Sequence, residues 1–288
     1  MTHTPQTPAP VAARGGRVAA FFDLDKTIIA TSSAFAFGKE FLNNGLITPS
    51  EALQLSLAKA GYMLAGQSSE QMDSTRDQLA AMIQGWSVRE VHDIAVETMH
   101  SVVTPAIYAE ARELIEAHRA QGHEVVIISA SASVLVRPIA QELGIEHVAA
   151  TELAEEDGRF TGEITFYCKG PAKADALTSM ADKLGVDLAA SYAYSDSTTD
   201  IPMLELVGNP VAVNPERGLK KHALERGWQV RTFKDPVPLI PKPSAREIGI
   251  SSAVLAGIAA VAGGVWLAQH PGLVSSVSAK LFGPKRGL

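Results

Sequence analysis

Short apolar runs that stop abruptly at polar residues recur along this chain of 288 residues. Runs of this length are typical of buried strands. The predicted strands are Val18–Phe22, Glu124–Ile128, Ser191–Tyr194 and Asn209–Pro215.

Helical patterns lie between these runs. An amphipathic helix is expected over Ala106–Gln121, where Gly122 is a C-terminal stop signal, and another over Ala174–Leu184. Thr151–Thr165, with Asp157-Gly158 in the middle, predicts a β-hairpin. Strands and helices that alternate in this way predict an α/β fold in which helices wrap a parallel sheet.

Two stretches differ from this alternation. Residues 1–17 are rich in Thr, Pro, Ala and Gly and are expected to form a disordered lead-in. They lack the uninterrupted apolar core of a signal peptide, so export is not expected. Residues 33–104 are almost entirely helical in pattern, with Phe and Met residues that are expected to form the core of a helical insertion.

The first apolar run ends in two carboxylates, Asp23 and Asp25, separated by Leu24. Strand alternation predicts that both point to the same side, at the sheet edge where open α/β folds place their chemistry. Two close carboxylates repel each other unless a cation or a shared proton lies between them. The pair therefore indicates a metal site, an acid and a nucleophile, or both. The alternative is a strand end in which Asp25 caps the next helix.

The later runs end in polar groups that complete a recognisable set. Ser129 begins Ser-Ala-Ser-Ala-Ser, Lys173 ends Lys-Gly-Pro-Ala-Lys, and residues 195–200 read Ser-Asp-Ser-Thr-Thr-Asp. With Asp-Leu-Asp-Lys-Thr at residues 23–27, these segments resemble the four ordered motifs of the haloacid dehalogenase (HAD) superfamily, specifically the phosphoserine-phosphatase-like hydrolases of its subfamily IB.

The resemblance covers residues 18–231 and implies the fold in more detail. Residues 18–32 and 105–235 would form a Rossmann-like parallel-sheet core (the HAD fold), and residues 33–104 would form a helical C1-type cap. Such a cap would close over the site, exclude water and select substrates.

The resemblance also implies the catalytic roles. Asp23 would be the nucleophile that becomes an aspartyl phosphate, since a carboxylate needs no base to attack. Asp25 would protonate the leaving oxygen and then deprotonate the hydrolytic water. Ser129, Ala130 and Lys173 would bind the phosphate, with the lysine placing positive charge beside it.

A divalent cation follows from the same resemblance. Mg²⁺ prefers hard oxygen ligands, which would come from Asp23, the backbone carbonyl of Asp25, and Asp196. Asp200 would hold Lys173 or a metal-bound water. Taken alone, the last two aspartates could merely cap the helix that follows them.

The chain departs from the family pattern at several positions. Serines and a threonine stand where many members have glycines and an asparagine, at Ser195, Ser197 and Thr199. Phosphoserine phosphatases carry a glutamate soon after the first motif to bind the substrate's amino group, whereas Ala30–Ala34 contains no acid. The cap arginine that would bind the substrate carboxylate has only Arg76 and Arg89 as candidates. The resemblance therefore supports the chemistry better than it supports phosphoserine.

Composition excludes several other functions. Cys168 is the only cysteine, which forbids an internal disulfide, suits a reducing compartment and provides no zinc site. The net charge is −6, and no basic stripe with stacking aromatics is evident, which argues against nucleic acid as a partner.

The C-terminal region contains an uncharged run, Ile248–Ala268, that is long enough to cross a bilayer. Ala256, Ala260 and Gly264 form a small-residue stripe, and Trp266 lies near one end. We expect a linker at 236–247, a single-pass transmembrane helix at 248–268 and a tail at 269–288, which would anchor the enzyme to the cytoplasmic face of the cell membrane. The alternative is a buried or partner-packed helix in a cytoplasmic protein.

These observations predict a Mg²⁺-dependent phosphomonoester hydrolase that acts through an aspartyl phosphate on a small phosphorylated metabolite. A lipid-phosphate phosphatase, acting for example on lysophospholipids at the membrane, is one alternative. A phosphate-binding regulator that has lost turnover is another, although the intact set of Asp23, Asp25, Lys173 and Asp196 argues against it.

Overall fold

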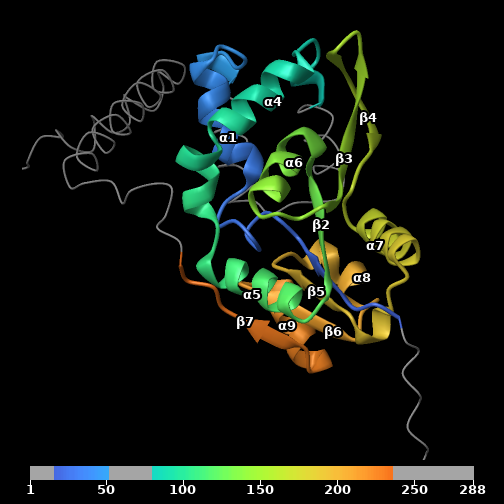
Figure 1. Cartoon of the computed structure of the whole chain (residues 1–288). Helices are drawn as coiled ribbons and strands as arrows, with labels where there is room; N and C mark the ends of the chain where they lie inside the picture. Colours follow the sequence, from blue (N-terminus) through green and yellow to red (C-terminus); the bar gives the residue numbers. More distant parts are fainter. Residues whose placement is uncertain (1–15, 52–79, 236–288) are drawn as a thin grey trace, which may run out of the picture. The chain divides into compact units, whose positions relative to one another are not determined.

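Strand β1 (Ala19–Phe22) lies within a seven-stranded sheet in a computed structural model that describes residues 16–51 and 80–235 (Figure 1). The strand order is β4-β3-β2-β1-β5-β6-β7. All neighbours run parallel except β3 and β4, which are antiparallel. The other strands are β2 (Glu124–Ala132), β3 (His147–Glu156), β4 (Arg159–Phe166), β5 (Tyr192–Ser195), β6 (Asn209–Val213) and β7 (Gln229–Arg231). The predicted α/β fold with a mostly parallel sheet is confirmed.

Helices cover both faces of this sheet, because β1 is apolar on both sides. Phe21 belongs to a hydrophobic cluster with residues of α7, α8 and α9, whereas Phe22 belongs to a second cluster with residues of α5 and α6. The helices are α5 (Ala109–Ala120), α6 (Ser133–Glu142), α7 (Pro171–Leu184), α8 (Ile201–Leu204) and α9 (Arg217–Arg226). Single 3-10 turns, η3 (Leu188–Ala190) and η4 (Thr198–Asp200), flank β5. Burial on both faces explains why β1 reads as a continuous apolar run rather than an alternating one.

Helix α5 confirms the predicted end of its segment but not the predicted start. It stops before Gly122, whose φ of 73° suits a glycine after a helix. It begins at Ala109 rather than at Ala106, because Thr104–Ala106 forms the separate 3-10 turn η2. The next residue, Ile107, is extended and pairs with Ile29.

The segment between β1 and β2 contains α1 (Ser33–Asn43), α4 (Val88–Glu97), a π-helical turn η1 (Met99–Val103) and η2. Phe37 and Phe41 of α1 and Met99 of η1 are buried in the same cluster as Phe22, which agrees with their interpretation as core residues. The chain leaves and rejoins the sheet side by side, since the Ala30 N–H donates to the carbonyl of Ala106 at 2.8 Å.

The predicted hairpin is confirmed as β3–β4, which turns at Asp157 and Gly158 with φ of 50° and 72°. Positive φ at both central residues is the requirement of a tight type I′ hairpin turn. The turn reaches the helical segment, where the Val88 N–H donates to the carbonyl of Gly158 at 3.0 Å. In Figure 1 the hairpin extends alongside α4 in accordance with this contact.

Several predicted parts lie outside the described residues. These are the lead-in up to residue 15, residues 52–79 of the helical insertion, and the linker, helix and tail from residue 236 onward. Within residues 16–51 and 80–235, no helix is both long enough and apolar enough to cross a bilayer.

Candidate active site

Asp23 lies directly after β1 and is buried in the centre of the sheet edge. Its backbone N–H donates to the carbonyl of Tyr194 on β5 at 2.9 Å, which continues the strand pairing for one residue. The Thr27 hydroxyl lies 3.4 Å from Asp23 Oδ2. The loop turns sharply after the pair, with φ of 61° at Lys26, a left-handed conformation that is uncommon for a residue other than glycine.

A buried ion cluster surrounds Asp23. Lys173, in the first turn of α7, places Nζ 2.6 Å from Asp23 Oδ1 and 2.7 Å from Asp200 Oδ2. The Ser195 hydroxyl donates to the same Asp200 oxygen at 2.7 Å. Three residues predicted from separate motifs thus meet in one cluster. The side chain of Asp200 makes no capping hydrogen bond to α8, so the cap interpretation of this residue is wrong.

Burial perturbs both charges of this cluster. It raises the pKa of Asp23 to about 7, and the opposing attraction of Lys173 offsets this only in part. Burial alone would lower the pKa of Lys173, but its two carboxylate neighbours outweigh that effect and raise it. The lysine is therefore a permanent cation, whereas Asp23 needs additional positive charge to remain fully ionised near neutral pH.

Asp25 has different partners. Its Oδ1 accepts the N–H of Ser33, the first residue of α1, at 2.7 Å, and its Oδ2 accepts the hydroxyl of Ser131 at 2.7 Å. The Ser33 hydroxyl in turn donates to Ser131 Oγ at 2.7 Å. The helix-cap interpretation of Asp25 is thus correct in geometry, because the carboxylate receives an N–H at the start of α1. That contact fixes one oxygen and is compatible with a catalytic role.

A bulge in β2 carries the next motif. This strand continues to Ala132, beyond the predicted end at Ile128, and its register with β3 shifts between Ser129 and Ala132. The Thr151 hydroxyl holds the bulge by donating to the carbonyl of Ala130 at 2.7 Å. Ser129 is fully buried and its Oγ accepts the Ser131 N–H at 3.1 Å, while the bulge brings the Ser131 hydroxyl to Asp25.

Asp196 follows β5 and is buried, with its Oδ2 3.8 Å from Nζ of Lys26. Burial raises its pKa to about 8, and the charge of Asp23 adds to this increase. Lys26, Ser33 and Ser131 were not among the predicted site residues. For Lys26, the available signal was its place inside the first motif, directly after Asp25.

The residues present suit a divalent cation. Among the contacts that the structure describes here, four aspartates (Asp23, Asp25, Asp196 and Asp200) accompany two lysines (Lys26 and Lys173), so carboxylates outnumber these lysines in a largely buried site. Among residues 16–51 and 80–235, no three His, Cys, Asp or Glu side chains form a group that could hold a metal. The predicted ligand set instead has two carboxylates and one backbone carbonyl. Mg²⁺ is commonly bound by one or two carboxylates and several waters, so this set fits.

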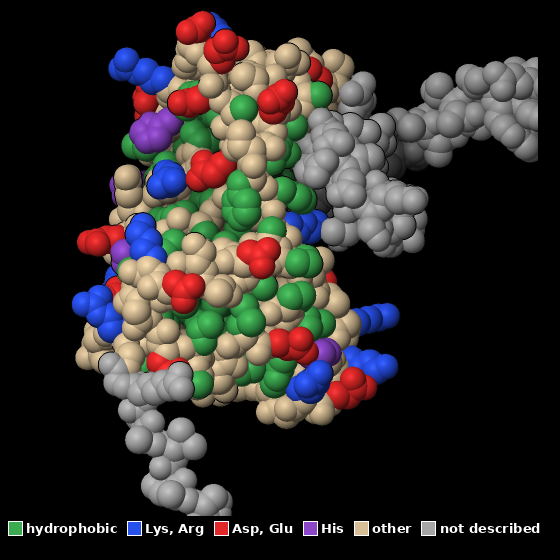
Figure 2. Space-filling view, turned by 90° about the vertical axis from the view of Figure 1, so that its right-hand side faces the viewer, with side chains coloured by type: hydrophobic (Ala, Val, Ile, Leu, Met, Phe, Trp, Pro, Cys, Tyr) green, Lys and Arg blue, Asp and Glu red, His purple; other side chains and the backbone are tan. Residues whose placement is uncertain are grey.

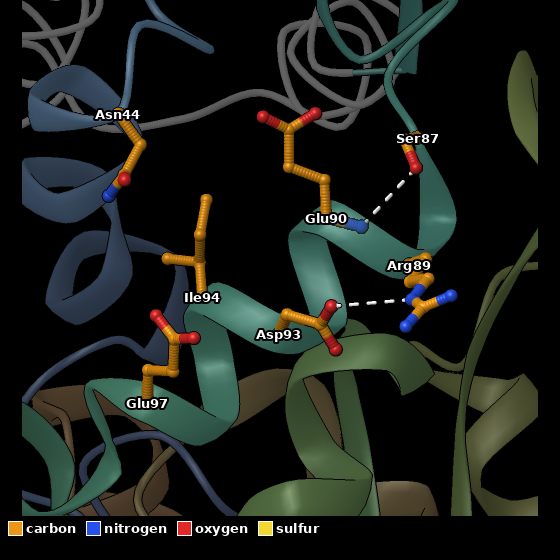
Figure 3. Close-up of a pocket in the computed structure, with 7 residues that line it drawn as sticks. All are labelled: Asn44, Ser87, Arg89, Glu90, Asp93, Ile94 and Glu97. Carbon is orange, nitrogen blue, oxygen red and sulfur yellow. Dashed lines mark hydrogen bonds and ion pairs between the residues drawn. The ribbon is translucent and has the colours of Figure 1, made fainter.

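The remaining residues considered in the sequence analysis make no hydrogen bond or ion pair with these carboxylates among the described contacts, or lie outside the described residues. Arg89, on α4, is 90% exposed and pairs with Asp93 at 3.6 Å beside a surface pocket of about 310 Å³ (Figure 3). Arg76 lies outside the described residues. Cys168 is buried, and burial raises the pKa of its thiol to about 12, which makes it a poor nucleophile.

The charge on the face seen in Figure 2 is mixed, because Lys and Arg side chains alternate with Asp and Glu and with apolar patches. On this face, therefore, the Lys and Arg side chains do not gather into a single basic patch. This mixed distribution accords with the net charge of −6.

Comparison with known proteins gives consistent matches. A family model described as haloacid dehalogenase-like hydrolase matches residues 20–205. A Mycobacterium tuberculosis protein named "probable phosphatase" is 49% identical over 263 residues, which cover 90% of this chain and 91% of that protein. A phosphoserine phosphatase of the same species is 35% identical over 271 residues, or 90% of this chain and 88% of the other. The crystal structure of a Bordetella pertussis protein of unknown function has a TM-score of 0.67 at 28% identity, covering 75% of this chain and 98% of that one.

Proposed function

This chain is a phosphoric monoester hydrolase of the haloacid dehalogenase-like hydrolase family, in its phosphoserine-phosphatase-like branch, and we propose that it is Mg²⁺-dependent and forms an aspartyl phosphate. The observation that carries the proposal is the pair of carboxylates after β1 with different partners. Asp23 is held by the cation Lys173, and Asp25 is held by the Ser131 hydroxyl and the Ser33 backbone N–H.

In the first half of the reaction, a carboxylate oxygen of Asp23 attacks phosphorus and the bond to the leaving oxygen breaks. Oδ1 is paired with Lys173 at 2.6 Å, whereas the described part of the chain gives Oδ2 a single, long contact, with the Thr27 hydroxyl at 3.4 Å. Oδ2 is therefore the oxygen that we assign as the nucleophile. Asp25 donates its proton to the leaving oxygen, so that an alcohol departs.

In the second half, Asp25, now a carboxylate, takes a proton from a water that attacks the aspartyl phosphate. Inorganic phosphate leaves and the carboxylate of Asp23 is regenerated. In both halves, the phosphoryl oxygens are stabilised by the charge of Lys173 and by hydrogen bonds from the Ser129 hydroxyl and the backbone at Ala130. These groups are already in position before the reaction.

Asp23, the carbonyl of Asp25, and Asp196 would hold Mg²⁺. A bound Mg²⁺ supplies positive charge that neutralises Asp23 and the phosphoryl group. The raised pKa values of Asp23 and Asp196 support this assignment, because burial disfavours both carboxylates by more than the nearby lysines Lys173 and Lys26 offset.

The test is hydrolysis of 4-nitrophenyl phosphate by the purified full-length chain. We expect turnover with Mg²⁺, none with excess EDTA, and recovery when Mg²⁺ is restored. Asp23→Asn should abolish turnover and also abolish the phosphorylated enzyme detected by mass spectrometry after acid quench. Substantial turnover by Asp23→Asn would exclude the covalent route, and a fully inactive wild-type chain would favour a phosphate-binding regulator.

For the substrate, we propose a small phosphorylated metabolite without a strong preference for phosphoserine. The stretch Ala30–Ala34 contains no acid, and the hydroxyl of Ser33 is already bonded to Ser131. A substrate ammonium therefore lacks a charged partner there, and a missing buried charge pair costs recognition. A screen of phosphorylated metabolites should place L-phosphoserine within about 100-fold in kcat/KM of other small esters, equivalent to about 2.7 kcal/mol. A larger preference for phosphoserine would contradict this proposal.

A lipid phosphate is the second candidate, and the uncharged run at 248–268 favours it. We propose that this run anchors the chain to the cytoplasmic face of the membrane. The full-length chain should then sediment with membranes and resist a carbonate wash, whereas a chain ending at Pro243 should not. The shortened chain should retain its activity on small esters, because every proposed catalytic residue precedes Ile201. Full-length protein that stays in the supernatant would contradict the anchor.

A further inference from the structure

A chain of hydroxyl groups joins Asp25 to the start of helix α1. The Ser33 hydroxyl donates to Ser131 Oγ at 2.7 Å, and the Ser131 hydroxyl donates to Asp25 Oδ2 at 2.7 Å. The Ser33 N–H also donates to Asp25 Oδ1 at 2.7 Å. Both carboxylate oxygens of Asp25 are thus engaged by residues that lie far apart in the sequence.

The chemistry of these partners suits a group that must exchange a proton. A hydroxyl can donate to a carboxylate and, after rotation, accept from a protonated carboxyl. Ser131 can therefore support both states of Asp25, with its own proton turned toward Ser33 when Asp25 is protonated. A lysine in this place would stabilise only the carboxylate. Lys173, by contrast, contacts Asp23 and Asp200.

The surroundings hold these hydroxyls firmly. Ser33 is completely buried in the first turn of α1. Ser131 lies in the β2 bulge, which the Thr151 hydroxyl holds through the carbonyl of Ala130. A general acid must lie within hydrogen-bond distance of the atom that it protonates, so fixing the rotamer of Asp25 affects the rate directly.

We propose that Ser131, oriented by Ser33, is the positioning residue that holds Asp25 for acid–base catalysis. Because Ser33 is the first residue of α1, the packing of α1 then also affects the position of the Asp25 carboxyl group. This inference rests on the proposed function. Ser131 need not touch the substrate, since it acts through Asp25.

The test compares Ser131→Ala with Ser133→Ala on two esters. The Ser133 hydroxyl donates to Glu152 at 2.6 Å, which makes it a matched control in the same motif. An alkyl phosphate needs the acid, because its alkoxide leaves poorly, whereas 4-nitrophenolate leaves without much help. Ser131→Ala should therefore lower kcat/KM for the alkyl phosphate roughly tenfold more than for 4-nitrophenyl phosphate. Ser133→Ala should leave the ratio of the two rates unchanged, and Ser131→Thr should restore it.

The background variant Asp25→Asn provides a second readout. Adding Ser131→Ala to it should cost no further rate on the alkyl phosphate, since a residue that acts through Asp25 has no effect without it. An equal loss on both esters, or full additivity with Asp25→Asn, would overturn the inference. If Ser131→Ala does not fold, Ser33→Ala, which keeps the N–H contact, should shift the same ratio in the same direction, and an unchanged ratio there overturns it equally. A folded wild-type chain that cleaves neither ester would instead refute the proposed function.

Discussion

Asp23 and Asp25 both follow strand β1 and are two residues apart, yet their surroundings differ. Asp23 shares the cation Lys173 with Asp200 inside a buried ion cluster, whereas Asp25 is bound by Ser33 and Ser131 through neutral donors. In the proposed mechanism, the first arrangement would keep a carboxylate anionic once a cation is bound, and the second would let a carboxyl donate and accept a proton. The comparison shows that two identical side chains have different partners, and in the proposed mechanism these partners set their different roles.

The partners also come from different layers of the fold. Lys173 belongs to α7, which packs on the Phe21 face of β1, whereas Ser33 belongs to α1, whose core residues join the Phe22 cluster. The expected strand alternation does not extend over the two aspartates, because β1 ends at Phe22. Asp25 nevertheless remains close enough to raise the pKa of Asp23.

The largest effect should come from Lys173→Met, which removes the cation from the first arrangement. Asp23 and Asp200 would be left as buried neighbours without the Lys173 counterion, and the phosphoryl group would lose the positive charge of this lysine. We expect turnover to fall at least about 1000-fold and the free energy of unfolding to fall by about 3 kcal/mol, measured by 4-nitrophenyl phosphate hydrolysis and urea denaturation. Lys183→Met, on the exposed side of the same helix, is the control and should change neither quantity. Activity within tenfold of wild type in Lys173→Met would remove the basis for the comparison.

The second prediction changes Asp25, which is bound by Ser33 and Ser131. Asp25→Asn keeps an oxygen for the Ser33 N–H but cannot donate or accept the catalytic proton. Turnover should fall about 100- to 10,000-fold, and the phosphorylated enzyme should accumulate, because hydrolysis of the intermediate loses its base. Mass spectrometry after acid quench measures that species. Asp182→Asn, an exposed aspartate of α7, should behave as wild type. Accumulation in Asp23→Asn as well would assign the phosphorylation to another residue.

Much of the first arrangement could be predicted from the sequence, whereas the second could not. Asp23, Lys173 and Asp200 each lie within or beside a predicted strand or helix, and the resemblance of the ordered motifs to those of the family implied that they meet. Ser131 depends on the bulge that continues β2 past Ile128. A bulge changes which side chains share a face, and no pattern of apolar residues records it.

Turns and helix ends outside the site show the same difference: those fixed by a local sequence signal could be predicted, and those fixed by contacts with distant residues could not. The hairpin turn at Asp157-Gly158 and the stop at Gly122 were predictable because each requires positive φ, which few residues adopt. The late start of α5 was not predictable from amphipathicity, because Ile107 is apolar in either conformation and its pairing with Ile29 decides the outcome. The metal ligands remain a prediction, as does the membrane anchor.

The third prediction measures how far the ion cluster depends on added positive charge. The pKa of Asp23 is raised to about 7 and that of Asp196 to about 8, both from 3.8, so the folded chain binds more protons than the unfolded chain between about pH 4 and 8. That contribution to stability is present at low pH and is lost as the pH rises through 7 and 8. The melting temperature of the metal-free protein should therefore fall from pH 6 to pH 8.5, and Mg²⁺ should raise it more at pH 8.5 than at pH 6. Asp196→Asn should flatten this dependence, and a metal-free melting temperature that rises over the same range would contradict it.

The fourth prediction concerns His118 of α5 and has the smallest expected effect on activity. It tests a second contribution to the pH dependence of stability. This buried imidazole lies 2.7 Å from the Tyr194 hydroxyl and 2.9 Å from Nδ1 of His123, a cluster that sequence spacing did not reveal. Burial lowers its pKa to about 4 from 6.5, with the neighbouring His123 adding to the effect. The folded chain therefore binds fewer protons than the unfolded chain between pH 6.5 and 4, so this contribution is present above pH 6.5 and is lost as the pH falls through that window.

The direction is opposite to that of the aspartates, and the His118 window of pH 4 to 6.5 lies inside theirs, so only the difference between a His118 variant and the wild type isolates the His118 contribution. His118→Gln stays neutral and can still hydrogen-bond Tyr194, so its melting temperature should fall less than that of the wild type between pH 6.5 and 4.5. Its rate of 4-nitrophenyl phosphate hydrolysis at pH 7.5 should match the wild type, because the imidazole takes no part in the proposed reaction. His92→Gln, whose ring is 50% exposed, is the control and should keep the acid sensitivity of the wild type. If the melting temperatures of His118→Gln and the wild type change equally between pH 6.5 and 4.5, the loss of stability in acid comes from groups other than His118.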